Sequence, residues 1–424
     1  MDLLQANEVS RLSEADRRLA TEIVMGVLRW QGALNQKIES LSGKPSSYFD
    51  PEVFTTLRMG VYQILFLTRI PAHAVVNEAV ELTKWANKRS AAGLVNAVLR
   101  KCKPLAAAPT SAEAAWGDAE WGALVRAATP TWMFERWERQ FGAGAAFALA
   151  YAGLQIPPTT LRTRAGARDA VAVQLREQGV ETNPGRFAPN ALSIRGGDFY
   201  DSDVFRGGEV VVQDEASQLV AALLTPRRGD RVLDLCAAPG IKTAQIAEAL
   251  GEGTLMSCDV SAARLATMKR LLDGRIPQGV QTEVLLLDAT LKLPFAESFD
   301  RALVDAPCSG TGTLARNPEI KWRLQSGEFE RLSKMQTAIL KNTLATLAPG
   351  GRLVYATCSL EPEENEKVVE AVLAAYPGFR LLGKEDLAQE FPAWAELFDP
   401  SGYFRTRPEM HGMDGFFAAV ITRV

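Results

Sequence analysis

The sequence predicts an α/β protein in which a doubly wound, mainly parallel sheet is preceded by an all-helical domain and a small α+β domain. Strand-like and helical segments alternate regularly from about residue 206 onward, which is the pattern of a doubly wound sheet. Residues 8–104 instead repeat apolar side chains at helical spacing, and a mixed region separates the two parts. We therefore place domains at residues 1–110, 111–210 and 211–424.

The composition is that of a soluble globular protein, with 47% hydrophobic and 23% charged residues. No apolar run approaches the roughly 18 residues that are needed to span a membrane. Residues 1–8 lack the basic segment and the apolar core of a signal peptide. We therefore expect a cytoplasmic protein without a membrane partner, and we expect it to be a monomer.

Cysteine chemistry is what the composition leaves open. The five cysteines are scattered without paired spacing, which argues against a disulfide framework and against a zinc site. Only two histidines, His73 and His411, are present, so a histidine-rich metal site and a Ser-His-Asp triad are poorly supplied. We expect no bound metal.

Charge is distributed unevenly along the chain, and the helical domain is the more basic part. Residues 1–103 contain 14 Lys and Arg against 10 Asp and Glu, although the whole chain has a net charge of −3. The N-terminal part is therefore the better candidate for binding a polyanion. The basic residues of the last expected helix, 95–101, either contact phosphates or form a solvated face, and charge alone leaves both interpretations open.

The mixed region predicts a helix followed by a small sheet. The helix carries Trp132, Phe134, Trp137 and Phe141. A strand at 160–164, a helix at 167–178 and a strand at 191–195 follow. Arg162 and Arg164 on this sheet suit RNA phosphates but are equally explained as surface charges, and the sequence does not decide between these interpretations.

The C-terminal domain carries the regular alternation. We expect its strands at 231–235, 253–258, 282–287, 301–304, 352–356 and 416–422, and its main helices at 242–250, 262–272 and 328–347.

The first strand of this domain runs into a tight turn and a helix start, in the stretch VLDLCAAPGIKT (232–243). Small residues let the backbone approach a ligand closely, and a helix N-terminus offers free N–H groups. Asp259, Asp288 and Asp305 end the next three strands, where carboxylates commonly accept ribose hydroxyls. Such a row suits an adenosine-bearing cofactor without a pyrophosphate, so S-adenosylmethionine fits better than NAD. The alternative is a Rossmann-like domain with incidental aspartates.

Two cysteines follow apolar strands at corresponding places, Cys308 after 301–304 and Cys358 after 352–356. If these strands are neighbours, both thiols face one cleft at the carboxyl edge of the sheet. A lone free cysteine is more often a small buried hydrophobe than a nucleophile, but two at matching strand ends favour a function. By position alone, Cys308 is the first candidate nucleophile. The remaining thiols, those of Cys102, Cys236 and Cys258, lie in apolar elements, and we interpret them as structural.

Several long motifs then resemble known families. The N-terminal part resembles the NusB antitermination-factor domain, an RNA-binding helical bundle, through LRMGVYQIL (57–65), IPAHAVVNEAV (70–80) and VNAVLR (95–100). The remainder resembles the Sun/Nop2 family of S-adenosylmethionine-dependent RNA cytosine-C5 methyltransferases, through VVQDEAS (211–217), DAPCSG (305–310), NPEIKW (317–322), TCS (357–359) and GMDGFF (412–417). Together they cover nearly the whole chain and resemble the bacterial 16S ribosomal RNA methyltransferase B subgroup.

The resemblance implies a class I S-adenosylmethionine-dependent methyltransferase fold and a role for each site residue. It implies that Cys358 adds to cytosine C6 as the nucleophile and that Cys308 assists product release. Asp305 is implied to hold the base edge around N3 and N4, and Lys242 to support the cleft. The implied cofactor-binding residues are Cys236, Ala237, Ala238, Pro239, Gly240, Ile241, Lys242, Asp259, Arg264, Asp288 and Asp305. The implied partner is 16S ribosomal RNA, unassembled or partly assembled, with the target cytosine unpaired or flipped out.

Two departures from the family pattern leave alternatives open. The family usually has two glycines before the lysine, whereas this chain has Gly240-Ile241-Lys242, and a β-branched residue is disfavoured where φ is positive. The chain also has Thr163-Arg164 where the family often has Val-Asn, so RNA contacts there do not carry over. The alternatives are a transfer RNA cytosine-C5 methyltransferase and a catalytically weakened RNA-binding or ribosome assembly factor.

Overall fold

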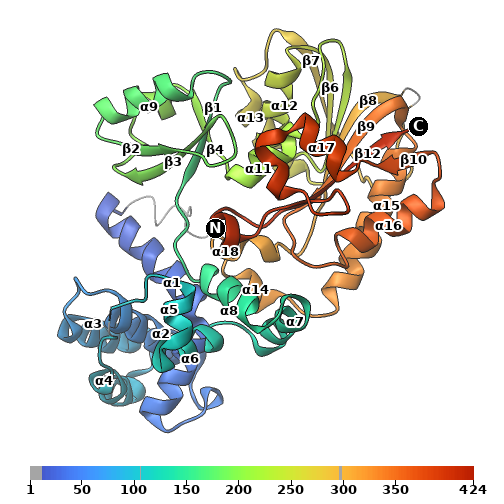
Figure 1. The fold of residues 1–424 in the computed structure, drawn as a ribbon. Coiled ribbons are helices and arrows are strands. Elements are labelled where there is room, and N and C mark those ends of the chain that lie inside the picture. The colour runs from blue at the N-terminus through green and yellow to red at the C-terminus, as the bar shows by residue number, and fades with distance from the viewer. Residues whose placement is uncertain (1–11, 106, 296–297) are drawn as a thin grey trace. The chain divides into compact units, whose positions relative to one another are not determined.

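A computed structural model describes residues 12–105, 107–295 and 298–424 (Figure 1). The chain forms two compact units. The first contains the described residues up to Ile156 together with Leu314–Arg323, and the second contains Pro157–Thr313 and Leu324–Val424. Residues 8–11 of the expected helical domain lie outside the described residues. The three domain boundaries placed from the sequence stay a prediction.

The first unit is helical, as the sequence predicts. Ser13 caps its first long helix by accepting the Asp16 N–H, Gly43 ends that helix with φ of 66°, and Pro51 starts the next. The helices are α1 (Glu14–Ser42), α2 (Pro51–Phe66), α3 (Ala72–Trp85), α4 (Ala92–Lys101), α5 (Ala112–Gly117), α6 (Ala119–Ala127), α7 (Thr131–Phe141), α8 (Ala143–Ala152) and α14 (Ile320–Arg323), with 3-10 turns η3 (Ser46–Tyr48) and η4 (Arg89–Ala91). Among the described helices, none combines the length and the apolar character required to cross a membrane.

The segment Leu314–Arg323 belongs to this helical unit although it comes from the second half of the chain. The Lys321 ammonium is buried and donates to the carbonyls of Arg29 at 2.7 Å and Ala128 at 2.6 Å. The Trp322 indole N–H donates to the Leu28 carbonyl at 2.6 Å. Burial lowers the pKa of Lys321 to about 7, with a smaller contribution from the Arg29 charge. The NPEIKW motif is therefore built to hold this segment on the helical unit.

The second unit begins with a small antiparallel sheet in the order β2-β3-β1-β4. Two of its strands and its long helix lie where the sequence predicts them, and the short, exposed β2 and the three-residue β4 were not predicted. The elements are β1 (Thr160–Thr163), α9 (Arg168–Glu177), β2 (Glu181–Pro184), β3 (Ala191–Gly196), α10 (Asp203–Arg206) and β4 (Val210–Val212). The small domain is α+β, as expected.

The large sheet has the order β10-β12-β9-β8-β5-β6-β7, with β11 paired to β12. All pairs from β9 to β7 are parallel, and the C-terminal strand β12 runs antiparallel to β9. This confirms the mainly parallel sheet. Its strands are β5 (Arg231–Leu235), β6 (Glu252–Asp259), β7 (Gly279–Leu286), β8 (Phe299–Asp305), β9 (Leu347–Thr357), β10 (Phe379–Leu381), β11 (Phe404–Arg405) and β12 (Phe417–Arg423).

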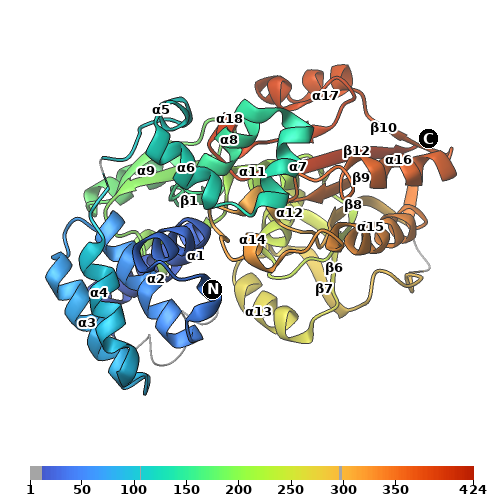
Figure 2. The same cartoon turned by 90° about the horizontal axis from the view of Figure 1, so that it is seen from below.

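Helices cover both faces of this sheet. One apolar core joins one face of the strands to α11 (Glu215–Ala222), α12 (Ile241–Leu250), α17 (Lys384–Glu390) and η6 (Pro392–Leu397). A second core joins the other face to α15 (Glu328–Leu344) and α16 (Glu366–Ala375), which lie side by side (Figure 2). The remaining elements are α13 (Ala262–Leu272), η5 (Thr311–Thr313) and α18 (Pro408–His411). Two buried faces explain why the central strands are apolar throughout.

Candidate active site

The predicted site residues gather at the carboxyl edge of the large sheet. β8, β5, β6 and β7 are consecutive neighbours, so their ends form one row. Asp305 ends β8, Cys236 follows β5, Asp259 ends β6 and Asp288 follows β7. Ligands bind at this edge in open α/β sheets. The expected row of acceptors is therefore present.

The turn between β5 and α12 has the backbone shape of a close ligand approach. Cys236 has φ of 60° and Gly240 has φ of 99°. A Cβ at Gly240 would lie 2.7 Å from Cγ of Met268, so only glycine fits there. Ile241 is the first residue of α12 and has no positive φ. The departure from two glycines thus puts no backbone strain on Ile241.

A buried carboxylate fastens the start of α12 to the sheet. The Thr243 hydroxyl donates to Asp234 Oδ2 at 2.6 Å, and both residues are fully buried. Asp234 Oδ1 has no hydrogen-bond partner among the described residues. Burial raises the pKa of Asp234 to about 7. Because Thr243 follows Lys242 directly, this bond fixes where the lysine leaves the helix.

Asp259 and Arg264 hold the other side of the turn. Asp259 accepts the N–H groups of Ala238 at 3.2 Å and Ser261 at 2.9 Å, and Arg264 lies 3.4 Å from its carboxylate. Arg264 also donates to the Ala238 carbonyl. Arg264 therefore supports the turn, and its own contact with a cofactor stays a prediction.

The residues present fit S-adenosylmethionine. α12 has no side-chain cap, so the N–H groups of its first turn are available to a carboxylate. Asp259 accepts three donors, which leaves capacity at a carboxylate with about four lone-pair sites. Asp288 is exposed, and its hydrogen bonds to Thr290 lower its pKa, so it stays an ionised acceptor. The N–H donors match the amino-acid carboxylate of S-adenosylmethionine, and the aspartate acceptors match its nucleoside.

Lys242 and Asp305 form the charged pair of the site. The Lys242 ammonium lies 2.8 Å from Asp305 Oδ2, with both side chains partly buried. Burial lowers the pKa of Lys242, but the neighbouring Asp305 and Cys358 charges outweigh it, so the pKa is raised. The lysine is therefore a cation paired with the Asp305 carboxylate. Asp305 Oδ1 has no hydrogen-bond partner among the described residues.

The structure brings the two predicted thiols together. β8 and β9 pair in parallel, and the Sγ atoms of Cys308 and Cys358 are 3.2 Å apart. The hydrogen bond to Cys358, burial, and the Cys358 and Glu364 charges raise the pKa of Cys308 well above its usual value. Cys308 is thus kept as a thiol in the free protein. The expectation that both thiols face one cleft agrees with this geometry.

Glu364 is the residue that the sequence did not single out. It is completely buried, and its carboxylate accepts Ser309 N–H at 2.8 Å, the Ser309 hydroxyl, the Ser359 hydroxyl at 2.5 Å and Gln336 Nε2 at 3.0 Å. Ser309 follows Cys308 and Ser359 follows Cys358, so one carboxylate joins both cysteine loops. Its signal in the sequence is an acidic run, residues 361–366, that lies directly after an apolar strand and a thiol.

Replacing Glu364 with glutamine is expected to lower the free energy of unfolding by roughly 2–3 kcal/mol, because an amide N–H group then faces donors in a buried site. Methyl transfer is expected to fall further than folding does, since the spacing of the two thiols depends on this carboxylate. Urea unfolding and single-turnover methyl transfer measure the two effects. Glu363→Gln is the matched control because Glu363 is partly exposed, and its ion pair with Lys367, at 3.1 Å, lies near the surface. Equal behaviour of the two variants contradicts the assignment.

The other three cysteines lie in environments that disfavour their thiolate forms. Cys102 and Cys258 are buried, and burial raises their pKa to about 11 and about 12. Burial and the surrounding aspartates also raise the pKa of Cys236. These environments agree with a structural role for all three.

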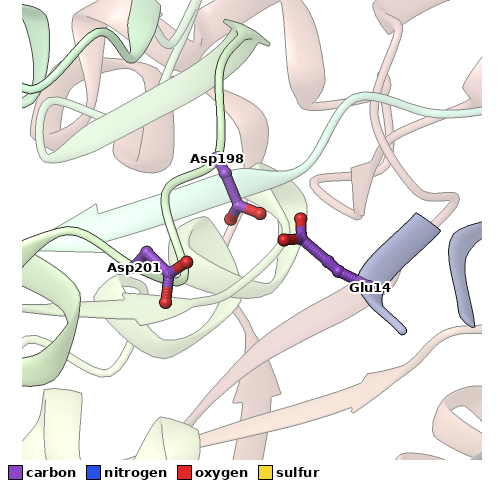
Figure 3. Close-up of side chains that lie close together, drawn as sticks. All are labelled: Glu14, Asp198 and Asp201. Atoms are coloured by element: carbon purple, nitrogen blue, oxygen red, sulfur yellow. The ribbon is translucent and has the colours of Figure 1, made fainter. Parts of the chain in front are cut away.

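Figure 3 draws three acidic side chains, those of Glu14 in α1 and of Asp198 and Asp201 in the segment before α10. Glu14 pairs with Arg18 within its helix, and Asp201 pairs with Arg206 at 2.6 Å. Asp198, which is partly buried, accepts the Tyr200 N–H at 2.9 Å, and we assign no metal to the three carboxylates.

The sheet order, the turn before α12 and the acceptor row define an S-adenosylmethionine-dependent methyltransferase. The model of the family described as 16S rRNA methyltransferase RsmB/F matches residues 221–422. The NusB family model matches residues 2–104, and a ferredoxin-like domain of the RsmF/B-like methyltransferases matches residues 129–197. The chain belongs to the RsmB/F family of 16S rRNA methyltransferases.

Relatives that match this chain over nearly its whole length show that it belongs to this family. The ribosomal RNA small subunit methyltransferase B of Pseudomonas putida is 36% identical over 98% of this chain and 93% of its own length. The probable enzyme of the same name from Bacillus subtilis is 33% identical over 98% of this chain and 92% of its own length. The crystal structure of PH0851 has a TM-score of 0.78 and 27% identity, covering 97% of this chain and 91% of that one.

Proposed function

We propose that this protein methylates C5 of an unpaired cytosine in 16S ribosomal RNA through a covalent bond between Cys358 and C6 of the base. The observation that carries the proposal is the pair of sulfurs, 3.2 Å apart, beside the Lys242–Asp305 ion pair. The names of the full-length relatives support ribosomal RNA as the substrate. We further propose that the protein acts as a cytoplasmic monomer.

Cysteine addition solves the main chemical difficulty, which is that cytosine C5 is a poor nucleophile. The Cys358 thiolate forms a bond to C6, and the C5–C6 π electrons move through the ring toward N3, leaving an enamine at C5. Asp305 Oδ1 accepts the N4–H of the base, which orients the ring and stabilises the adduct.

Release then restores the aromatic base. S-adenosylmethionine supplies an electrophilic methyl group to C5 and leaves as the thioether. While Cys358 is bonded to C6 it is an uncharged thioether, so its charge no longer raises the pKa of Cys308, and Cys308 can lose its proton to solvent. The Cys308 thiolate then takes the C5 proton, directly or through water, the C5–C6 double bond re-forms, and the Cys358 thiolate is expelled. Every electron pair is returned, so Cys358 is regenerated for the next turnover.

A catalytically weakened assembly factor loses its only sequence support. That alternative rested on strain at Ile241, and Ile241 instead adopts the first position of α12 without a positive φ. The positive φ that requires glycine lies at Gly240. The cofactor turn is therefore intact in this chain.

Bisulfite sequencing tests the proposal. Unmodified 16S ribosomal RNA and transfer RNA are incubated with the protein and S-adenosylmethionine, and cytosines that resist conversion are mapped. We expect one protected cytosine in a loop of 16S ribosomal RNA and none in transfer RNA. Protection in transfer RNA alone contradicts the substrate, and the absence of any protected cytosine contradicts the chemistry.

A further inference from the structure

A polar cavity of about 230 Å³ lies within the second unit, between the small antiparallel sheet and the large sheet's helices. Its lining includes Arg162 and Arg164 from the end of β1, Glu248 from α12 and Arg275 from the connection between α13 and β7. The cofactor turn and the thiols are not among its lining residues. The two arginines that the sequence left unassigned thus meet a third one here.

Arg162 is the fixed member of this set. It is 6% exposed, and its guanidinium donates to Gln213 Oε1 at 2.8 Å and to Glu248 Oε2 at 2.6 Å. Glu248 also accepts the Ala165 N–H at 2.7 Å, so it fastens the end of β1 to α12. The charges of Arg162 and Glu248 balance each other. The wall of the cavity is therefore rigid and roughly neutral on this side.

Arg164 and Arg275 supply the excess positive charge. Arg162, Arg164 and Arg275 all line this cavity. Burial, followed by the Arg162 and Arg164 charges, lowers the pKa of Arg275. Arg275 donates to the Gly208 carbonyl at 3.3 Å, which aims its side chain but does not neutralise it. Arg164 is exposed and forms no ion pair with a described residue. Besides Glu248, the lining contains a single acid, Glu209. An anion in the cavity would relieve this repulsion.

We propose that this cavity, the three-arginine pocket, binds a backbone phosphate of the substrate RNA. Guanidinium forks match phosphate oxygens in bidentate geometry, and phosphate contacts fix the register of a nucleic acid without reading its sequence. Glu248 lies six residues after Lys242, about 9 Å along α12, so one RNA strand can reach both the pocket and the catalytic cleft. The inference rests on the proposed function for the identity of the RNA.

Filter binding of 16S ribosomal RNA by the full chain tests the pocket. The variant is R164Q/R275Q, which leaves Arg162 and its contact with Glu248 in place. The matched control is R168Q/R176Q, which removes the same charge from α9 of the same domain, outside the pocket. Between 50 and 200 mM salt, we expect the pocket variant to weaken binding about tenfold and to reduce the slope of log K against log salt by about 1. The control is expected to change binding by less than about twofold.

Three further readouts keep the outcomes separate. Calorimetric affinity for S-adenosylmethionine should be unchanged in both variants, which shows that the methyltransferase domain is folded. Equal RNA binding and equal salt slopes in the two variants overturn the proposal. Binding of inorganic phosphate that is lost in R164Q/R275Q while RNA binding is kept overturns it too, because the pocket then serves another anion. Failure of the proposed function appears instead as a missing bisulfite signal with the native protein, independently of these binding results.

Discussion

Replacing Cys358 with alanine is expected to reduce methyl transfer to RNA by at least about a thousandfold, because without the thiolate no bond forms at C6 and C5 stays unreactive. The variant is expected to bind RNA and S-adenosylmethionine as the native protein does, since the Lys242–Asp305 pair and the turn before α12 do not include this side chain. Single-turnover transfer of a radioactive methyl group measures the loss, and binding assays measure what is kept.

Cys258→Ala is the control for this result. Cys258 is also a cysteine at the end of a central strand, and it is 1% exposed. Its replacement leaves a small cavity, so it should cost stability rather than chemistry. Full activity of Cys358→Ala contradicts the assignment of Cys358 as the nucleophile. Full activity of Cys358→Ala with loss in Cys308→Ala shows that the two roles are exchanged.

The sequence predicted the architecture where the pattern is long and periodic. α13 and β5 have the bounds that alternation and apolar spacing indicate. β5 is buried between the two cores of the large sheet, and α13 buries its apolar side against α12 and the turn before it. β10 and β2 escaped prediction, since each is short and pairs by one side with a longer strand. Their strand character comes from that partner and not from a local pattern.

The sequence also predicted which residues meet at the site, because strand ends of a parallel sheet share one edge. It did not predict what sets their protonation. The raised pKa of Cys308 depends on its contact with Cys358 and on the buried Glu364, and both follow from tertiary packing. Position suggested Cys308 as the nucleophile, whereas its surroundings favour a thiol there. We base the two proposed roles, nucleophile and release thiol, on the environment of each cysteine and not on its position after a strand.

Lys321 shows the same limit in the helical unit. Its motif resembles one of the methyltransferase family, yet its ammonium is buried against carbonyls of α1 and of the residue after α6. A lysine is almost never expected to be buried from sequence alone. Leu314–Arg323 follows the Cys308 loop in the chain, but it belongs to the helical unit and the loop belongs to the other unit. Only the folded structure shows to which unit this segment belongs.

Replacing Cys308 with alanine is expected to trap the protein on its RNA as a covalent adduct. Addition of Cys358 to C6 and methylation of C5 need no thiol at position 308, but removal of the C5 proton is then slow, so the Cys358–C6 bond persists. Turnover should fall by about a hundredfold or more, the usual contribution of a positioned general base. A denaturing gel with labelled RNA displays the adduct as a band of lower mobility. The methyl group in this adduct comes from S-adenosylmethionine.

The double replacement Cys308→Ala with Cys358→Ala separates this trap from tight non-covalent binding. The slow band should vanish in the double variant, because the bond to C6 is made by Cys358 and by no other thiol in the cleft. A band that survives in the double variant, or a Cys308→Ala protein that turns over normally without any adduct, contradicts the release role. Because the two sulfurs lie 3.2 Å apart, either thiol can reach the same base, and the adduct is what distinguishes attack from release.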